Sequence, residues 1–99
     1  MMEYMEWIQV QAASGQVTTL EDKLFGVVKD LRSKKAFKGL LRTDGFRHVS
    51  LAGCFSILLV WNSDAPVHQG STLGMHLKET MKTFGLVNHS VWINRDPSR

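Results

Sequence analysis

The chain has 99 residues, of which 43% are hydrophobic, and 12 Lys and Arg against 9 Asp and Glu give a formal charge of +3. This length fits one domain over residues 1–99, with an ordered core over 3–94 and a tail over 95–99 that frays. The single cysteine, Cys54, excludes a disulfide framework and a multi-cysteine zinc site, and the sequence has neither a secretory signal nor a membrane-length apolar run, so we expect a cytoplasmic protein without membrane contact.

The first predicted element is a strand. Residues Tyr4 to Ala13 alternate between an aliphatic side and a side that carries Trp7, Gln9 and Gln11. We therefore expect one face of this strand to pack on a core, and the other to present an aromatic ring among polar groups.

A helix follows, and the sequence after it is harder to assign. Apolar residues recur with the helical period from Thr19 to Ser33, behind a capping box formed by Thr18 and Glu21. The stretch 34–45 contains the turn-forming pair Asp44-Gly45. We expect a connector there, with at most a turn or two of helix.

Two strands joined by a tight turn come next. They run from Phe46 to Leu51 and from Phe55 to Asn62, and Gly53 can supply the positive φ that the turn needs. The second strand is almost continuously apolar, which is typical of a central strand covered on both faces.

The last part of the chain predicts a helix and a strand. Ser71 or Thr72 caps the helix, and Gly85 ends it in the left-handed conformation. The final strand, Val87 to Asn94, alternates again. The apolar stripe of the helix consists of Leu73, Leu77, Met81 and Phe84.

The order strand, helix, strand, strand, helix, strand predicts a ferredoxin-like α+β fold. Its sheet has four antiparallel strands with both helices on one face, and the first strand and the Phe55–Asn62 strand lie at the centre. The helices leave the other face uncovered, and that face would carry Trp7. Such an apolar face is unusual for a monomer, so we expect a homodimer, a small apolar ligand, or both.

The segment from Phe55 to Ser63 resembles part of a known family. A strand that ends in an apolar-Trp-x-Ser pattern before the second helix, as residues 60–63 do, is similar to the antibiotic-biosynthesis monooxygenase-like proteins of the dimeric α/β-barrel superfamily. The resemblance implies that two sheets pack into a barrel around small clefts between sheet and helices. Members of the family include cofactor-independent oxygenases that act on aromatic compounds, haem-degrading enzymes and many proteins with no known activity, so the resemblance implies oxygenation of an aromatic compound as one of these alternatives.

This chain departs from the haem-degrading branch of the superfamily. The haem-degrading branch of the superfamily uses an Asn on the first strand and a His and a Trp on the second helix. This chain has Gln9 and Gln11 on the first strand and His76 on the helix, without a Trp there. We therefore expect no cofactor.

Five residues are candidates for a site. Trp7, Gln9 and Trp61 are expected to form the walls and polar handles of a ligand pocket, although tryptophans also serve plain packing. His48 and His89 alternate with sheet residues and are candidate general bases, or else partly buried histidines satisfied by a neighbour.

Other functions are less well supported by the residues. The histidines show no metal-ligand spacing, so no metal site is expected. The basic stretch from Lys29 to Arg47 fits a solvated helix end better than a nucleic-acid surface, because aromatic residues do not interleave at stacking spacing. The alternative to an enzyme is a non-catalytic domain whose sheet face serves dimerisation or docking on a protein.

Overall fold

The computed structural model describes residues 2–34, 37–64 and 69–95, so of the predicted tail over 95–99 only Arg95 lies within the described residues. Its six elements follow the predicted order. They are β1 (Met2–Ala12), α1 (Val17–Lys34), β2 (Leu40–Arg47), β3 (Cys54–Ser63), α2 (Thr72–Met81) and β4 (Gly85–Ile93).

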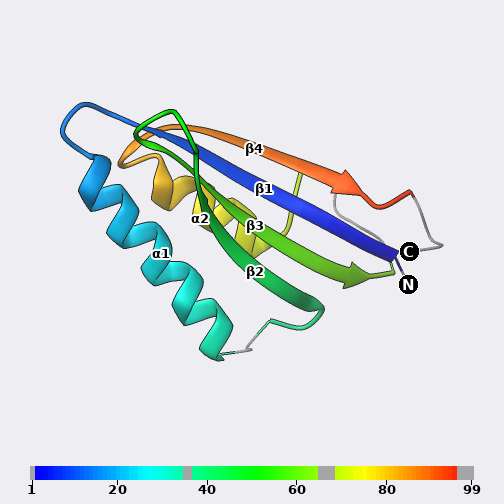
Figure 1. Cartoon of the computed structure of the whole chain (residues 1–99). Coiled ribbons are helices and arrows are strands. Elements are labelled where there is room, and N and C mark those ends of the chain that lie inside the picture. The colour runs from blue at the N-terminus through cyan, green and yellow to red at the C-terminus, as the bar shows by residue number, and fades with distance from the viewer. Residues whose placement is uncertain (1, 35–36, 65–68, 96–99) are drawn as a thin grey trace.

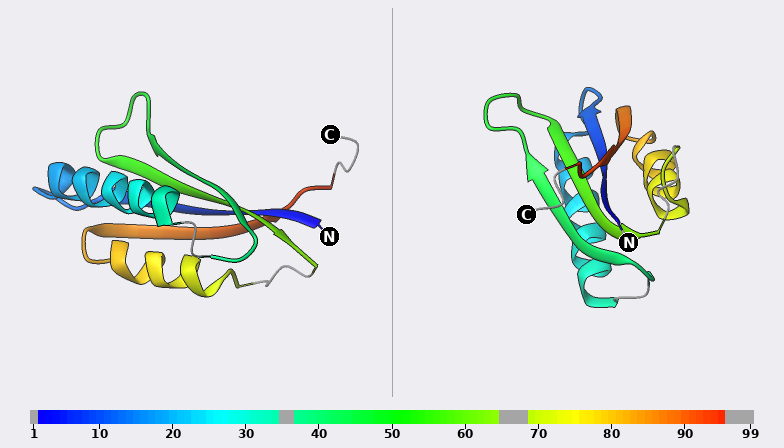
Figure 2. Two further views of the ribbon diagram at one scale, coloured as in Figure 1. Left: turned by 90° about the horizontal axis from the view of Figure 1, so that it is seen from below. Right: turned by 90° about the vertical axis from the view of Figure 1, so that its right-hand side faces the viewer.

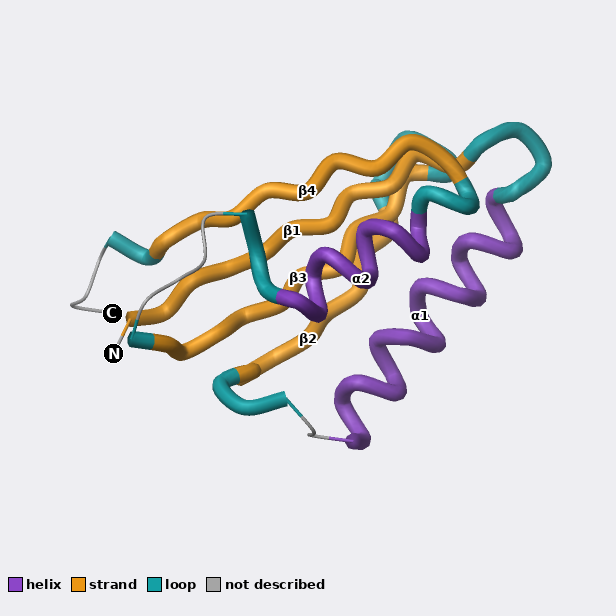
Figure 3. The backbone as a smooth tube through the Cα atoms, turned by 180° about the vertical axis from the view of Figure 1, so that it is seen from behind, coloured by secondary structure: helices purple, strands orange, loops and turns teal. Residues whose placement is uncertain are grey.

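The strands form one antiparallel sheet in the order β2-β3-β1-β4, with both helices on the same face (Figure 1). Seen from behind, α1 crosses the side of β2 and β3, and α2 lies over β1 and β4 (Figure 3). The predicted ferredoxin-like α+β fold, with β1 and β3 at the centre, is confirmed. Neither described helix combines the length and apolarity that crossing a membrane requires.

The core fills the space between the sheet and the helices. It forms because alternate residues of β1 and β3 meet the apolar stripes of α1 and α2, and burial of that surface is the main favourable term in folding. Its fully buried aliphatic members are Ile8, Leu20, Leu24, Ile57, Leu59 and Met81.

The other side of the sheet, which we call the open face, is covered by neither of the two described helices. Strand register assigns its side chains, because residues paired across neighbouring strands point to the same side. The open face consists of Glu3, Met5, Trp7, Gln9 and Gln11 of β1; Cys54, Ser56, Leu58, Val60 and Asn62 of β3; Arg42, Asp44 and Phe46 of β2; and Leu86, Asn88, Ser90 and Trp92 of β4.

The prediction for residues 34–51 was wrong in its boundaries. β2 begins at Leu40, so the expected connector contributes most of the strand, and residues 48–53 form the β2–β3 loop in place of a tight turn. As an edge strand, β2 accommodates polar residues that obscured the pattern. Gly45 lies within β2 and does not form a turn. A glycine is needed there because the Phe25 ring packs against it, and an added Cβ would lie 2.8 Å from Phe25 Cε1. Gly53 does have the positive φ expected, at 83°.

The predicted cap of α2 is confirmed at Ser71, whose Oγ accepts from Gly74 N at 2.9 Å, but the other two helix boundary signals need correction. α1 begins at Val17 and Leu20 N already donates to Gln16 O at 2.8 Å, so Thr18 lies inside the helix and does not cap it. α2 ends at Met81, and Gly85 opens β4 without a positive φ. Gly85 is needed there because a Cβ would collide with the Gln11 carbonyl oxygen of β1.

Candidate functional site

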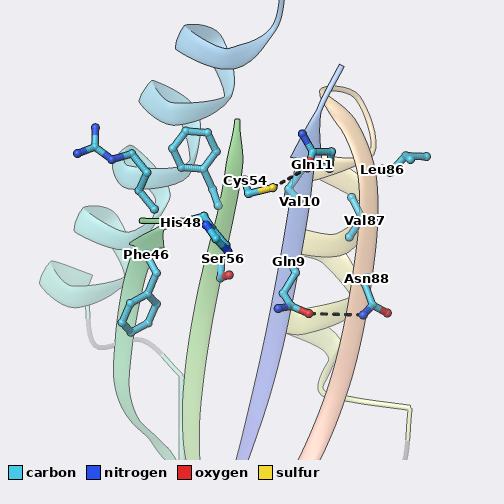
Figure 4. A pocket seen from close by; sticks show the side chains of 12 residues that line it. Gln9, Val10, Gln11, Phe46, His48, Cys54, Ser56, Leu86, Val87 and Asn88 are labelled. Atoms are coloured by element: carbon cyan, nitrogen blue, oxygen red, sulfur yellow. Dashed lines mark hydrogen bonds between the residues drawn. The ribbon is translucent and has the colours of Figure 1, made fainter. Parts of the chain in front are cut away.

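A hollow of about 540 Å³ lies on the open face, at the end of the sheet next to the β2–β3 loop (Figure 4). Its volume is within the range of about 300–1,000 Å³ that small-molecule sites have. We call it the open-face hollow. Its lining residues are Gln9, Val10, Gln11, Phe46, Arg47, His48, Cys54, Phe55, Ser56, Leu86, Val87 and Asn88.

Strand pairing places uncharged polar groups on the floor of the hollow. Ser56 and Asn88 are the two register partners of Gln9, and Asn88 Nδ2 donates to Gln9 Oε1 at 3.4 Å. One row further, Cys54 Sγ donates to Gln11 Oε1. Figure 4 shows these side chains converging from β1, β3 and β4. The floor therefore offers amide, hydroxyl and thiol groups that can orient a ligand.

Aromatic side chains border this floor. The rings of Trp7 and Phe46 lie 5.5 Å apart between centroids and are tilted by 44°. A smaller hollow of about 230 Å³, lined by Trp7, Gln9, Ser90 and Trp92, continues along the same face. A flat apolar molecule would thus find rings to pack against as well as polar handles.

His48 lies at the rim of the hollow, and its hydrogen bonds determine which ring nitrogen carries the proton. Its Nδ1 accepts hydrogen bonds from the backbone N–H groups of Ser50 and Leu51, at 3.1 and 3.0 Å. A neutral imidazole has one donor and one acceptor nitrogen, so Nε2 must carry the proton. His48 therefore offers a donor toward a ligand and does not offer a basic nitrogen.

A buried Glu6–His89 pair lies on the opposite face of the sheet, beneath the start of α2. His89 Nε2 is 2.7 Å from Glu6 Oε2, and the two side chains are 5% and 0% exposed. Glu6 Oε1 accepts the backbone N–H of Ser71, the N-cap of α2, at 3.0 Å. The carboxylate thus has a hydrogen-bond partner on each oxygen, as a buried charge requires.

Two glycines make the space for this pair. A Cβ on Gly74 would collide with Glu6 Oε2, and one on Gly70 would collide with the His89 ring. Burial, and then the nearby charge of Glu6, raise the pKa of Tyr4 on the same side of β1. The pair anchors the start of α2 to the sheet.

The structure brings three of the five candidate residues together and separates the other two. Trp7, Gln9 and His48 lie at or beside the open-face hollow. Trp61 points to the helix side, where it stacks on Tyr4 with centroids 6.2 Å apart, and His89 lies on the helix side as well. Trp61 Nε1 has no hydrogen-bond partner among the described residues.

Sequence reasoning missed Glu6, although the sequence held a signal for it. Glu6 falls in phase with Ile8 and Val10 on the side of the strand expected to be aliphatic. A carboxylate in that phase must be buried, and a buried carboxylate needs partners. The partners lie more than sixty residues away in the chain, so their identity could not be read from local pattern.

The basic stretch is partly neutralised. Arg32 Nη2 and Arg42 Nε each lie 2.8 Å from an oxygen of Asp44, and Arg32 Nε also donates to the backbone oxygen of Thr43 at 2.8 Å. Among the described residues, His, Cys, Asp and Glu side chains form no group of three or more that could hold a metal ion.

No family model matches the chain, and no curated protein matches its sequence. Its similarity is to solved structures. PA3566 from Pseudomonas aeruginosa is 18% identical with a TM-score of 0.71, over 97% of this chain and 97% of that chain. Rv0793 from Mycobacterium tuberculosis is 14% identical with a TM-score of 0.69, over 98% and 99%.

A third similar structure is a mutant of SnoaB, a cofactor-independent oxygenase from Streptomyces nogalater. It is 12% identical with a TM-score of 0.67, over 97% of this chain and 96% of that chain. The agreement spans whole chains at low identity. This chain therefore has the fold of these three proteins, a fold that supports cofactor-independent oxygenation in one of them.

Proposed function

We propose that this chain is a small homodimeric binding domain that takes a small aromatic or apolar molecule in the open-face hollow and oxygenates it without a cofactor. The observation that carries the proposal is the hollow itself, where uncharged polar groups of three strands converge beside Phe46 and Trp7. The shared fold with a cofactor-independent oxygenase supports the choice of chemistry.

The substrate class that suits this hollow is a phenol fused to a second ring. The rings would pack beside Phe46, and the His48 Nε2–H and the Gln9 amide would hold the phenol oxygen as its proton leaves to water. For 1-naphthol, the electron-rich carbon para to the oxygen takes up O2 and the resulting hydroperoxide loses water. The products are 1,4-naphthoquinone and water, so one oxygen atom enters the ring and the other leaves.

The composition of the open face supports a second copy as its cover. Between Met5 and Gln11 on β1, Cys54 and Val60 on β3, and Leu86 and Trp92 on β4, no side chain of this face carries a formal charge. An isologous interface places a surface against itself, so this uncharged stretch of β1, β3 and β4 avoids self-repulsion, and Arg42 and Asp44 on the edge strand β2 are paired with each other.

The size of the face also fits a dimer. Four strands about 4.8 Å apart and about nine residues long make a flat area of roughly 570 Å², before the relief of the side chains is counted. A standard interface buries about 800 Å² on each partner, which is of the same order.

Oxygen uptake with 1-naphthol tests the catalytic part. We expect uptake with formation of 1,4-naphthoquinone in the wild type and its loss in Ser56→Leu, which fills the floor of the hollow. Ser33→Leu makes the same change at an exposed position of α1, on the other side of the sheet, so uptake should persist. Equal rates in wild type, Ser56→Leu and buffer alone would contradict the proposal.

The structure also favours one alternative, a non-catalytic binding or dimerisation domain. His89, the second candidate base, is bonded to Glu6 on the far side of the sheet, and His48 presents a donor. A protein that binds 1-naphthol but consumes no oxygen would establish this alternative for the same hollow.

A further inference from the structure

The β2–β3 loop, residues 48–53, rises from the sheet on the side opposite the helices. Figure 2 shows this in both views, with the green loop standing away from the sheet on its open-face side while α2 lies on the other. A molecule bound to the open face would therefore lie next to the loop. The loop begins at His48, on the rim of the open-face hollow.

This loop exposes two apolar side chains to solvent. Val49 is 97% exposed and Leu51 is 55% exposed. From His48 to Gly53 the loop contains no Lys, Arg, Asp or Glu. A single exposed valine would need no explanation, but two exposed apolar side chains in an uncharged loop, next to the uncharged stretch of β1, β3 and β4, indicate a contact surface.

Hydrogen bonds hold the loop in this shape. His48 Nδ1 accepts from both Ser50 N and Leu51 N, and Cys54 O accepts from His48 N at 2.8 Å. The chain then closes with Cys54 N donating to Leu51 O at 3.3 Å. The two apolar side chains are thus presented by a loop whose backbone is already bonded, which lowers the entropy cost of binding through it.

We propose that the β2–β3 loop is a clasp that packs Val49 and Leu51 against a second copy of this chain seated on the open face. Two-fold symmetry then provides two equivalent clasps, each at the rim of one open-face hollow. The hollow is open in the single chain, and the clasped partner closes it. This inference rests on the homodimer of the proposed function and names the contact that stabilises it.

The partner surface has matching chemistry. Its exposed apolar side chains on the open face are Phe46, Leu86 and Trp92, at 42%, 80% and 58% exposure. Neither the loop nor these side chains would need to desolvate a charge on contact. A charged protein or nucleic-acid partner would find no complementary group on either.

The test is the dissociation constant of the dimer, measured by sedimentation of the full chain over a range of concentrations. We expect Leu51→Asp and Val49→Asp together to weaken the dimer by at least about 100-fold, because burial of four apolar side chains is lost across the two clasps. Leu41→Asp is the matched control. Leu41 and Leu51 are both 55% exposed, and Leu41 lies outside the loop, where it lines a hollow with Leu31 and Arg32 of α1. It should leave the dissociation constant unchanged.

The outcomes separate the clasp from the proposed function. A wild-type dimer that Val49→Asp with Leu51→Asp leaves intact would overturn the clasp and leave the dimer standing. A wild-type chain that stays monomeric at high concentration would overturn both. Unfolding midpoints of all variants, measured in parallel, show that a weakened dimer arises from the interface, since an exposed loop change leaves the fold in place.

Discussion

His89 Nε2 and Glu6 Oε2 lie 2.7 Å apart on the helix side of the sheet, while the open-face hollow lies on the other side. β1 carries groups for both sides, with Glu6 pointing to α2 and Gln9 pointing to the hollow. The sheet thus separates a buried structural pair from a binding surface, and mutations on the two sides should have separable effects on stability and on binding.

Replacement of Glu6 should reveal the buried pair as a stability determinant. Glu6→Leu leaves the Ser71 N–H and the His89 Nε2–H without an acceptor, so the free energy of unfolding should fall by about 3–5 kcal/mol. Glu6→Gln should cost only about 1 kcal/mol, because its amide oxygen accepts from Ser71 and its NH2 donates to the other tautomer of His89. Urea unfolding at neutral pH measures both.

The control for Glu6→Gln is the same change at an exposed site. Glu79 on α2 bonds Lys82 at the surface, so Glu79→Gln should leave the unfolding midpoint where it is. If Glu6→Leu also unfolded at the wild-type midpoint, the anchoring of α2 by this pair would be wrong.

Two glycine-to-alanine changes in helices should have opposite signs. Gly74→Ala drives a Cβ into Glu6 Oε2 and should destabilise the chain by about 1–3 kcal/mol, despite the better helix propensity of Ala. Gly26→Ala, in α1, meets nothing within 4 Å and should stabilise it by about 0.5–1 kcal/mol. Thermal or urea unfolding of the two variants measures both changes in stability. If both variants were more stable than the wild type, the close packing of Gly74 over Glu6 would be wrong.

Tyr4 should make stability depend on pH in the alkaline range. Burial and the charge of Glu6 raise its pKa above the ordinary 10.0, so between these two values the unfolded chain has lost a proton that the folded chain keeps. This contribution is fully present below pH 10 and is lost as the pH rises through the folded pKa. Tyr4→Phe should show a shallower alkaline decline in the free energy of unfolding.

The same residue can be followed directly. Tyr4 is the only tyrosine in the chain, so the tyrosinate absorbance reports this one group. Ionisation in the folded protein at the pH typical of a free tyrosine would contradict the raised pKa. In Glu6→Gln the pKa of Tyr4 should move toward 10.0, because the nearby negative charge is gone.

Much of the fold could be predicted because its signals are local. The alternation in β1, the helical period of α1 and the apolar run of β3 each reflect burial against a neighbouring layer. Their order then leaves few topologies. β2 was misplaced because one side of an edge strand faces solvent, so Arg42 and Asp44 interrupt the pattern that identifies a buried strand.

The site was less predictable because it depends on contacts between distant segments. Alternation correctly predicted that Trp7 and Gln9 share one face, because side chains two positions apart in a strand point to the same side. Trp61 was grouped with them, yet it faces the helices because its register partner is Tyr4. The pairing register between strands decides this, and a single sequence does not contain it.

The most direct test of the account is a titration of the chain with 1-naphthol, followed by tryptophan fluorescence, since Trp7 lies beside the open-face hollow. The account predicts saturable binding in the wild type, binding at least about tenfold weaker in Ser56→Leu, which fills the hollow, and wild-type binding in Ser33→Leu, on the exposed side of α1. Undiminished binding in Ser56→Leu, or no saturable binding in the wild type, would show that the open-face hollow is not the ligand site.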